Sequence, residues 1–322
     1  MASSIPIARP LEYRHDRAAF GRHQTFPLRY AWLSKGFQAF GENPGVFEAD
    51  DATVALGVGS NMVKAMLYWL LATGMLERTP EGLAATALGT LLFGPRGLDP
   101  WLEDEGTLWL LHWQLATNGP QATAWRWFFN EFHLPEFSLT EASQALEAHA
   151  RDRLRLKSIP RTLSNDLRIL LRMYEPPAPG RRTSLEDALD TPLSALGLVQ
   201  PLPDRQRHRS AAAERAGPPD AIFAFVVATL VDQIGRDTLP LGALMYGHPG
   251  FPALGAAFRL TENALLTKLE RFVRQRSTHY ALREQAGIHQ LYRLGSDTRD
   301  PLDELRAHYR PVSADPLPDG SM

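Results

Sequence analysis

The chain has 322 residues, of which 44 % are hydrophobic and 22 % are charged, and it contains no cysteine. This is the composition of a globular protein with a sizeable core, in about two domains or three small ones. The lack of cysteine excludes disulfides, cysteine nucleophiles and iron–sulfur clusters, and it fits the reducing cytoplasm. No run of about 18 apolar residues is present, so we expect a cytoplasmic protein with no membrane partner.

The net charge of −2 is unevenly distributed along the chain. Residues 40–110 hold 3 Lys or Arg against 10 Asp or Glu. Residues 151–215 hold 13 against 8, and residues 255–295 hold 7 against 3. Because phosphate groups are drawn to clustered cations, we expect any nucleic-acid surface in the second and third thirds of the chain.

The first module is predicted over residues 25–98. Asn61–Leu71 carries apolar residues at helical spacing behind a glycine-rich turn, and Leu76–Ala84 follows as a short hairpin. Asn61 and Lys64 lie on the side of this helix opposite its apolar stripe and are candidates for DNA contact. Because the surrounding sequence is acidic, a module that contacts another protein is an alternative.

Residues 99–137 are rich in aromatic side chains at helical spacing and are predicted to form a packed connecting unit. Tryptophans can also stack on the bases of single-stranded nucleic acid, but the apolar spacing favours a place in the core. Five of the seven tryptophans lie here: Trp101, Trp109, Trp113, Trp125 and Trp127.

The second module is predicted over residues 138–199. Ser138 and Glu141 have the spacing of a capping box, and Arg161–Tyr174 is the most amphipathic segment of the chain. The polar face of this segment offers guanidinium groups for phosphates and an amide for base edges, as a helix in a DNA groove requires. An ordinary solvated helix face is the alternative. The predicted DNA-contacting residues are Arg161, Ser164, Asn165, Arg168 and Arg172.

Two segments lack apolar periodicity. Residues 200–218 are rich in Pro, Arg and Ala and are predicted to be a flexible linker. Their basic run Arg205–Arg209 could become ordered along a phosphate backbone, with a mobile charged linker as the alternative. Residues 295–322 are predicted to be a loose tail.

The third module is predicted over residues 219–294. Thr261 stands where the N-cap of an amphipathic helix belongs. Lys268 and Arg271 lie on the polar side of that helix and are further candidates for DNA contact. A hairpin around Gln285–Gly287 follows and would form a wing beside a DNA groove.

The same order of helix, turn, amphipathic helix and hairpin thus recurs three times, which is typical of winged helices. We predict a mainly α fold with small β-hairpin wings, in which tandem winged helix-turn-helix modules surround a helical, aromatic-rich middle. The predicted segments are an N-terminal arm (1–24), a winged-helix-like module (25–98), a helical connecting unit (99–137), a helix-turn-helix-like module (138–199), a linker (200–218), a winged-helix-like module (219–294) and a tail (295–322).

Several short motifs are distinctive when taken together. They are HQTFPLRY at 23–30, DATV at 51–54, GVGSNMV at 57–63, DPWLED at 99–104, LWLLHWQL at 108–115, SLED at 184–187, PPDA at 218–221 and LYR at 291–293. With these motifs, about residues 20–294 resemble the bacterial family called domain of unknown function 4007. The resemblance implies a setting and no catalytic residue. Such proteins look like companions of sulfurtransferases similar to phosphoadenosine-phosphosulfate reductases, in DNA phosphorothioation and phage-defence gene neighbourhoods.

No motif in the sequence carries the chemistry of a known enzyme class. The turn Gly57–Ser60 lacks the lysine that ends a P-loop and the further glycine of a dinucleotide-binding fingerprint. His112, His133 and His149 are not at metal-ligand spacing, and Asp99 with the acids that follow it is better explained by capping of a helix. We therefore predict a protein that is not an enzyme and has no metal and no cofactor.

We predict a non-catalytic DNA-binding component of a bacterial DNA-modification system linked to phosphorothioation, or of a phage-defence system. Its partners would be double-stranded DNA and an enzyme that it recruits or regulates. That enzyme would resemble a phosphoadenosine-phosphosulfate reductase-type sulfurtransferase or a defence ATPase. One alternative is a protein-binding scaffold for the same sulfurtransferase or ATPase, and another is a winged-helix transcriptional regulator.

Overall fold

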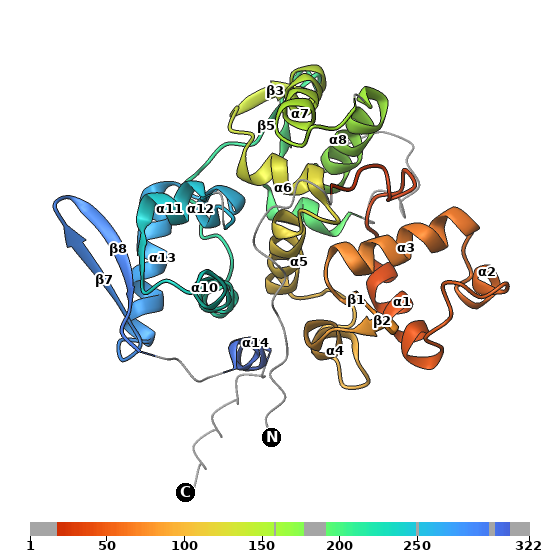
Figure 1. Ribbon diagram of the computed structural model, residues 1–322, viewed down its shortest axis with the longest axis horizontal. Coiled ribbons are helices and arrows are strands. Elements are labelled where there is room, and N and C mark those ends of the chain that lie inside the picture. Colours follow the sequence, from red (N-terminus) through yellow and green to blue (C-terminus); the bar gives the residue numbers. More distant parts are fainter. Residues whose placement is uncertain (1–17, 158, 177–190, 249–250, 296–299, 310–322) are drawn as a thin grey trace, which may run out of the picture.

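The computed structural model describes residues 18–157, 159–176, 191–248, 251–295 and 300–309. Helices dominate this part of the chain, together with three small antiparallel sheets, which confirms the prediction of a mainly α fold with β-hairpins. None of the helices described is long and apolar enough to cross a membrane. Figure 1 shows helix α5 at the centre, between the N-terminal helices on the right and the C-terminal ones on the left.

The N-terminal module packs α3 against α1 and continues into the hairpin β1–β2. Gly74 has a φ of 72°, which glycine adopts without strain, and this residue turns the chain from α3 towards β1. The strands pair from Leu76 with Ala85 to Thr79 with Gly82, which confirms the predicted hairpin. The elements are α1 (Tyr30–Glu42), α2 (Ala52–Ala55), α3 (Ser60–Ala72), β1 (Leu76–Thr79), β2 (Gly82–Ala85) and α4 (Ala87–Phe93).

The aromatic unit forms the centre of the core and comprises α5 (Glu105–Thr117) and α6 (Thr123–Asn130). Four of its five tryptophans are at most 6 % exposed, which confirms their predicted place in the core. Each such ring contributes about 2 kcal/mol or more by leaving water. The fifth, Trp101, is 68 % exposed and lies before α5.

The middle module packs α8 against α7 and closes with a three-stranded sheet. Ser138 and Glu141 exchange the two hydrogen bonds of a capping box, as predicted. Residues 200–218, expected to be a linker, contain strands β4 and β5. Local periodicity cannot reveal them, because Arg209 of β5 pairs with Glu136, 73 residues away. The elements are β3 (Glu136–Ser138), α7 (Leu139–Asp152), α8 (Pro160–Tyr174), the 3-10 helix η2 (Pro192–Leu196), β4 (Gln200–Pro201) and β5 (Arg207–Arg209).

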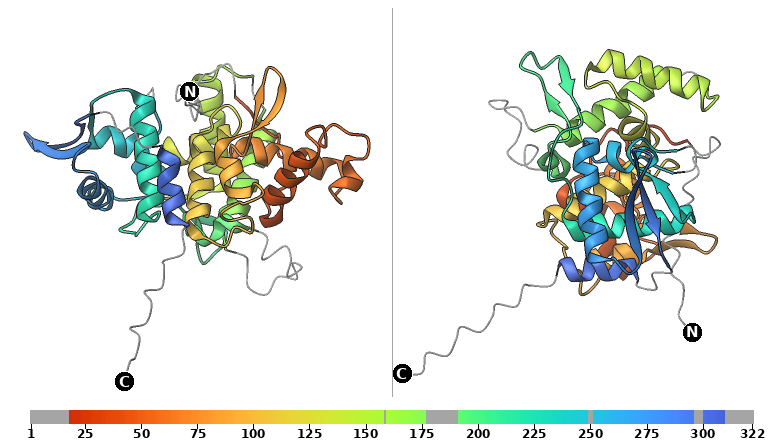
Figure 2. Two further views of the ribbon diagram at one scale, coloured as in Figure 1. Left: turned by 90° about the horizontal axis from the view of Figure 1, so that it is seen from below. Right: turned by 90° about the vertical axis from the view of Figure 1, so that its left-hand side faces the viewer.

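The C-terminal module packs α10 against α13 and joins β6 to the hairpin β7–β8. Thr261 caps α13 as predicted, and the predicted hairpin turns at Ala286 and Gly287, both of which have positive φ. Figure 2 shows this hairpin projecting from the body, and part of the expected tail forms α14 beside α10. The elements are α10 (Asp220–Ile234), β6 (Thr238–Pro240), α11 (Leu241–Tyr246), α12 (Leu254–Ala257), α13 (Glu262–Gln275), β7 (Tyr280–Gln285), β8 (Ile288–Arg293) and α14 (Pro301–His308).

The middle and C-terminal modules share one order of elements. With α6 counted in the middle module, each has a helix, a strand, two main helices and two further strands, and η2 in the middle module and α12 in the C-terminal one are short additions. In both sheets the last strand lies between the other two, in the orders β3-β5-β4 and β6-β8-β7. The N-terminal module has helices and a hairpin but no preceding strand among its described residues.

Two buried side chains connect these two modules. The guanidinium of Arg259 donates to two backbone oxygens of α6, at 2.9 and 3.3 Å, and to Ser210 Oγ at 2.9 Å. His112 of α5 lies 2.9 Å from Tyr174 Oη in the middle module and 2.8 Å from the Ala257 carbonyl oxygen in the C-terminal one. The relative placement of the two modules is therefore fixed by specific polar contacts as well as by apolar packing.

Candidate nucleic-acid interface

Helix α8 carries the five residues of the predicted DNA-contacting face. A proline starts the helix, at a position where no N–H partner is needed. Arg161, Arg168 and Arg172 are exposed, whereas Ser164 and Asn165 are partly buried. The apolar stripe of the helix is buried as predicted and consists of Leu163, Leu167, Leu170, Leu171 and Tyr174.

The turn between α7 and α8 adds cations that the sequence reasoning missed. Arg153, Arg155 and Lys157 are exposed in this turn, directly before the N-terminus of α8. The neighbouring Arg151 is different, because its Nε lies 2.8 Å from Asp152 Oδ1. The alternation of basic and apolar residues through this turn was the signal available in the sequence.

These cations form one charged set, here called the α8 basic surface. Within the described part of the chain, none of its members forms an ion pair with a carboxylate. Cations without counter-ions on the protein produce a positive potential that draws phosphate groups. The members of the α8 basic surface are Arg153, Arg155, Lys157, Arg161, Arg168 and Arg172.

A second side of α8 is held by the segment that precedes α1. The buried Asp166 carboxylate accepts hydrogen bonds from the backbone N–H of Gly21, at 2.9 and 3.1 Å, and lies 2.9 Å from His23 Nε2. His23 is itself fully buried and stacks with Trp69, with 12° between the ring planes. The sequence reasoning missed this pair, whose members are 143 residues apart. These contacts fix α8 in place, so its exposed side is presented rigidly.

The hairpin β4–β5 adjoins the C-terminal end of α8. His208 of β5 pairs through Nδ1 with Glu175, the residue that follows α8. Arg209 pairs with Glu136 at 2.6 Å, on the opposite face of the strand from His208. Arg205, in the connecting loop, is exposed and has no ion pair with a described residue. Within this basic run, Arg209 therefore stabilises the sheet, whereas the charge of Arg205 is not neutralised by a described residue.

Asn61 and Lys64 lie exposed on the N-terminal half of α3. Glu48, Asp50 and Asp51 are exposed in the segment before it. The segment before α3 is thus acidic and opposes the approach of a phosphate backbone, and Lys35 beside Gly57 offsets only part of that charge.

Lys268 does not lie on the outer face of α13, where its helical spacing placed it. Its Nζ donates to the Pro218 carbonyl oxygen at 2.7 Å and lies 3.3 Å from Asp220 Oδ1. Burial lowers the pKa of Lys268, and the Asp220 carboxylate opposes that shift. Arg271 is exposed, but its Nη1 lies 3.9 Å from the same carboxylate. The two predicted contacts on α13 therefore share an acidic partner from α10.

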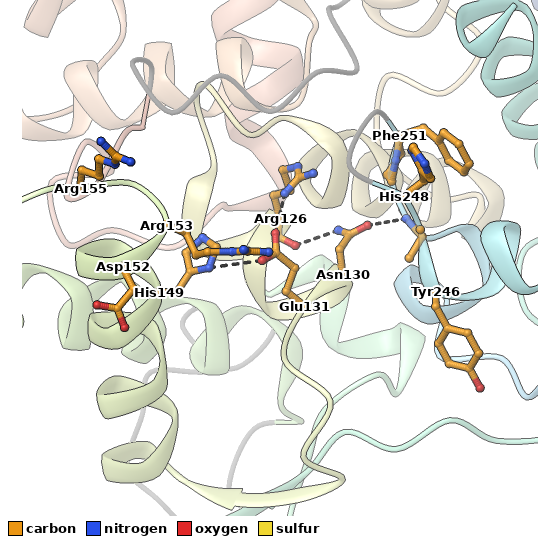
Figure 3. Close-up of a pocket in the computed structure, with 13 residues that line it drawn as sticks. Arg126, Asn130, Glu131, His149, Asp152, Arg153, Arg155, Tyr246, His248 and Phe251 are labelled. Atoms are coloured by element: carbon orange, nitrogen blue, oxygen red, sulfur yellow. Dashed lines mark hydrogen bonds and ion pairs between the residues drawn. The ribbon is translucent and has the colours of Figure 1, made fainter.

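A cavity of about 730 Å³ lies between the middle and C-terminal modules, close to the α7–α8 turn. Figure 3 shows charged side chains of α6 and α7 on one wall and aromatic side chains from the α11–α12 region on the other. The cavity was not anticipated from the sequence, because its two walls are about 100 residues apart. Its main lining residues are Arg126, His149, Arg153, Tyr246, His248 and Phe251.

Known proteins match this chain over nearly its whole length. A family model described as "Protein of unknown function (DUF4007)" matches residues 20–309. The chain belongs to this family. Two similar solved structures are titled "SspB crystal structure" and "Magnesium ion-bound SspB crystal structure", and each is 28 % identical to this chain. Their TM-scores are 0.78 and 0.79, and the match covers 92 % of this chain and 90 % and 89 % of theirs. No curated protein matches the chain.

Two acidic residues of this DUF4007 member that were considered for metal binding, Asp99 and Asp104, have structural partners. Asp99 accepts hydrogen bonds from the backbone N–H groups of Glu103 and Asp104, at 2.9 and 3.1 Å. Asp104 in turn caps α5 by accepting from the N–H of Gly106, which confirms the capping interpretation. Within the described ranges, no three His, Asp or Glu side chains are grouped so that they could hold a metal ion, and we assign no metal site.

Proposed function

We propose that this DUF4007 member binds double-stranded DNA through the α8 basic surface, as a non-catalytic component of a bacterial DNA-modification or phage-defence system. One observation carries the proposal: six exposed cations on α8 and its preceding turn have no acidic partner in the described part of the chain. In a chain with a net charge of −2, so many uncompensated cations on one helix and the turn before it indicate an anionic partner.

The order of elements supports this proposal. Helix, strand, helix, helix and a final pair of strands, with the last strand central, is the order typical of a winged helix. In that interpretation α7 and α8 form the helix-turn-helix, α8 is the helix that enters the major groove, and β4–β5 is the wing. The C-terminal module would be a second winged helix, with α13 in the same position.

The spacing of the polar residues along α8 suits contacts to both phosphates and base edges in a DNA groove. Arg161 and Arg172 are eleven residues apart and therefore lie about 16 Å apart along the helix axis, enough to reach separate phosphates. Asn165 lies on the same stripe, between the two, and its amide can pair with the edge of an adenine. The cations of the α7–α8 turn would contact the backbone beside the groove.

Family membership supports the setting of the proposal. The resemblance to DUF4007 implies neighbourhoods of DNA phosphorothioation and phage defence, where a DNA-binding protein would recruit or regulate a partner enzyme. The partner that this setting favours is a sulfurtransferase similar to phosphoadenosine-phosphosulfate reductases, or a defence ATPase.

The proposal is tested by fluorescence anisotropy with labelled duplexes. Plain and phosphorothioated duplexes of one sequence are titrated with the full chain at two salt concentrations. We expect binding that weakens as salt rises, because bound cations displace counter-ions from the DNA. The triple variant Arg161/Arg168/Arg172→Ala should bind at least about tenfold more weakly.

A matched triple variant controls for the loss of positive charge. Arg78, Arg96 and Arg236 are exposed and lie outside the middle module. Their replacement by Ala should change the affinity little. The proposal of binding through α8 is wrong if both triple variants lose affinity equally. It is also wrong if the wild-type chain binds no duplex at low salt.

One observation favours the protein-binding scaffold as a second candidate function. Val54 of α2 is 81 % exposed and follows the exposed acidic residues Glu48, Asp50 and Asp51 along the chain. An exposed apolar side chain in a mainly acidic segment suits a basic protein surface better than a phosphate backbone. A Val54→Asp variant that keeps DNA binding but loses binding to a purified sulfurtransferase partner would support this function.

A further inference from the structure

We infer that the cavity between the middle and C-terminal modules binds one nucleotide, with its phosphate against the α7–α8 turn and its base against the α11–α12 region. The inference extends the proposed function by giving a second, separate contact for nucleic acid. It rests on the lining of the cavity and not on the α8 face itself.

The cavity has the size and form of a ligand site. Its volume of about 730 Å³ falls within the range of small-molecule sites, about 300–1,000 Å³. Asn130 joins its two walls: Oδ1 accepts from the N–H of Ala253 at 2.8 Å, and Nδ2 donates to the Ala116 carbonyl oxygen at 2.7 Å. Figure 3 shows Asn130 between the charged and the aromatic side chains. The cavity is therefore preformed.

The charged wall has an excess of positive charge. Glu131 is bound by Arg126 Nη1 at 2.8 Å and by His149 Nδ1 at 3.2 Å, and Asp152 is bound by Arg151, which lies outside the lining. The carboxylates of this wall are thus engaged, while the lining residues Arg153 and Arg155 form no ion pair with a described residue. Both are exposed, and guanidinium groups bind phosphate oxygens in a bidentate manner.

The opposite wall offers flat aromatic surfaces. The His248 ring stacks on Phe251 with 5.3 Å between centroids and 15° between planes. Phe251 is buried, His248 is exposed, and both line the cavity. Tyr246, also in the lining, is 60 % exposed. Any nucleic-acid base can stack on such rings, whereas an inorganic anion has no flat surface that would stack on them.

The position of the cavity connects it with the α8 basic surface. Arg153 and Arg155 belong to both, since they line the cavity and lead into the N-terminus of α8. A strand bound along α8 could therefore deliver a terminal or extruded nucleotide into the cavity. A free nucleoside monophosphate presents the same phosphate and base, so the experiment must separate these two sources.

The test is calorimetric titration of the full chain with three probes: 2′-deoxyadenosine 5′-monophosphate, inorganic phosphate and a five-nucleotide single strand. The Arg153/Arg155→Ala variant should weaken the nucleotide probes at least fivefold. The Tyr246/His248→Ala variant should weaken the nucleotide probes but leave the affinity for inorganic phosphate unchanged. The Arg236→Ala control removes an exposed arginine that does not line the cavity and should have no effect.

Each outcome has a defined meaning. Binding of the free monophosphate identifies a nucleotide ligand, whereas binding of the strand alone, with the same variant effects, identifies a nucleotide within a polynucleotide. If no nucleotide probe binds, or if neither variant weakens binding, the inference is wrong. Duplex titration of the wild-type chain separates the two claims: if the wild-type chain binds no duplex but binds the nucleotide probes, and the cavity variants abolish that binding, the inference stands and the proposed function fails.

Discussion

The middle and C-terminal modules share one topology but use the cations of their equivalent helices differently. On α8 the arginines are exposed and have no acidic partner among the described residues. On α13, Lys268 is buried against Asp220 and a backbone carbonyl, and Arg271 lies near the same carboxylate. Asp220 stands in the first turn of α10, where a negative charge is also favoured by the helix dipole. The comparison teaches that topology supplies a possible binding helix, and that local ion pairing determines whether its charge is available.

The largest expected effect comes from breaking the joint between the two modules. Replacing Arg259 by Met removes the donors that bind the α6 carbonyls and Ser210, so several buried acceptors lose their partner. We expect a loss of about 3 kcal/mol in the free energy of unfolding, measured by urea denaturation. Arg274→Met, an exposed change on α13, should leave it unchanged. Equal stability of both variants would show that the modules do not depend on this joint.

Lowering the pH should weaken the contacts that His112 makes between the middle and C-terminal modules. Burial keeps the ring neutral at pH 7; because the Ala257 carbonyl can only accept, Nε2 of the neutral ring carries the proton and Nδ1 accepts from the Tyr174 hydroxyl. Burial lowers the pKa of His112 from 6.5 to about 3. The unfolded state therefore binds more protons between these values, and stability falls as the pH drops through this range.

The measurement compares the wild-type chain with His112→Asn at pH 7 and pH 5. Between these conditions the wild-type chain should lose about 2 kcal/mol more unfolding free energy than the variant. Parallel losses in the two proteins would mean that His112 is not held neutral.

The smallest expected effect concerns the pairing of the α13 cations with Asp220. Asp220→Asn removes the acidic partner of Arg271 and should raise DNA affinity about twofold, because one more cation becomes available. Without that carboxylate, the pKa of Lys268 should fall further, since burial then acts unopposed. Glu81→Gln in the β1–β2 turn, which removes one exposed negative charge without freeing a cation among the described residues, serves as the control in the anisotropy assay. An equal gain in both variants would show that only net charge matters.

Local features of this fold could be predicted from the sequence. Helix α8 begins one residue before the predicted segment and ends at the predicted residue, and both predicted hairpins are present. The capping box at Ser138 and the cap at Thr261 also follow from short-range spacing. In each case the determining contacts lie within about one helical turn or one hairpin, so periodicity and turn chemistry contain the information.

Features that depend on distant partners could not be predicted. The short strand β5 exists because it pairs with a segment some 70 residues earlier, so its own sequence looks like a linker. Lys268 resembles a surface cation until Asp220, 48 residues away, is seen to bind it. The nucleotide cavity likewise combines α6 and α7 with the α11–α12 region. Charge in a window of sequence reports neither pairing nor burial, which here separate α8 from α13.

The most direct test of the account is the salt dependence of duplex binding for two matched double variants. Arg168/Arg172→Ala removes two exposed arginines from α8, and Lys268→Met/Arg271→Ala removes the two cations of α13 that lie near Asp220. The slope of log affinity against log salt should become shallower by about 2 for the α8 variant, because each of the two arginines neutralises one phosphate, and should change much less for the α13 variant. If the two variants change the slope equally, or if only the α13 variant does so, the account of α8 as the DNA-contacting helix is contradicted.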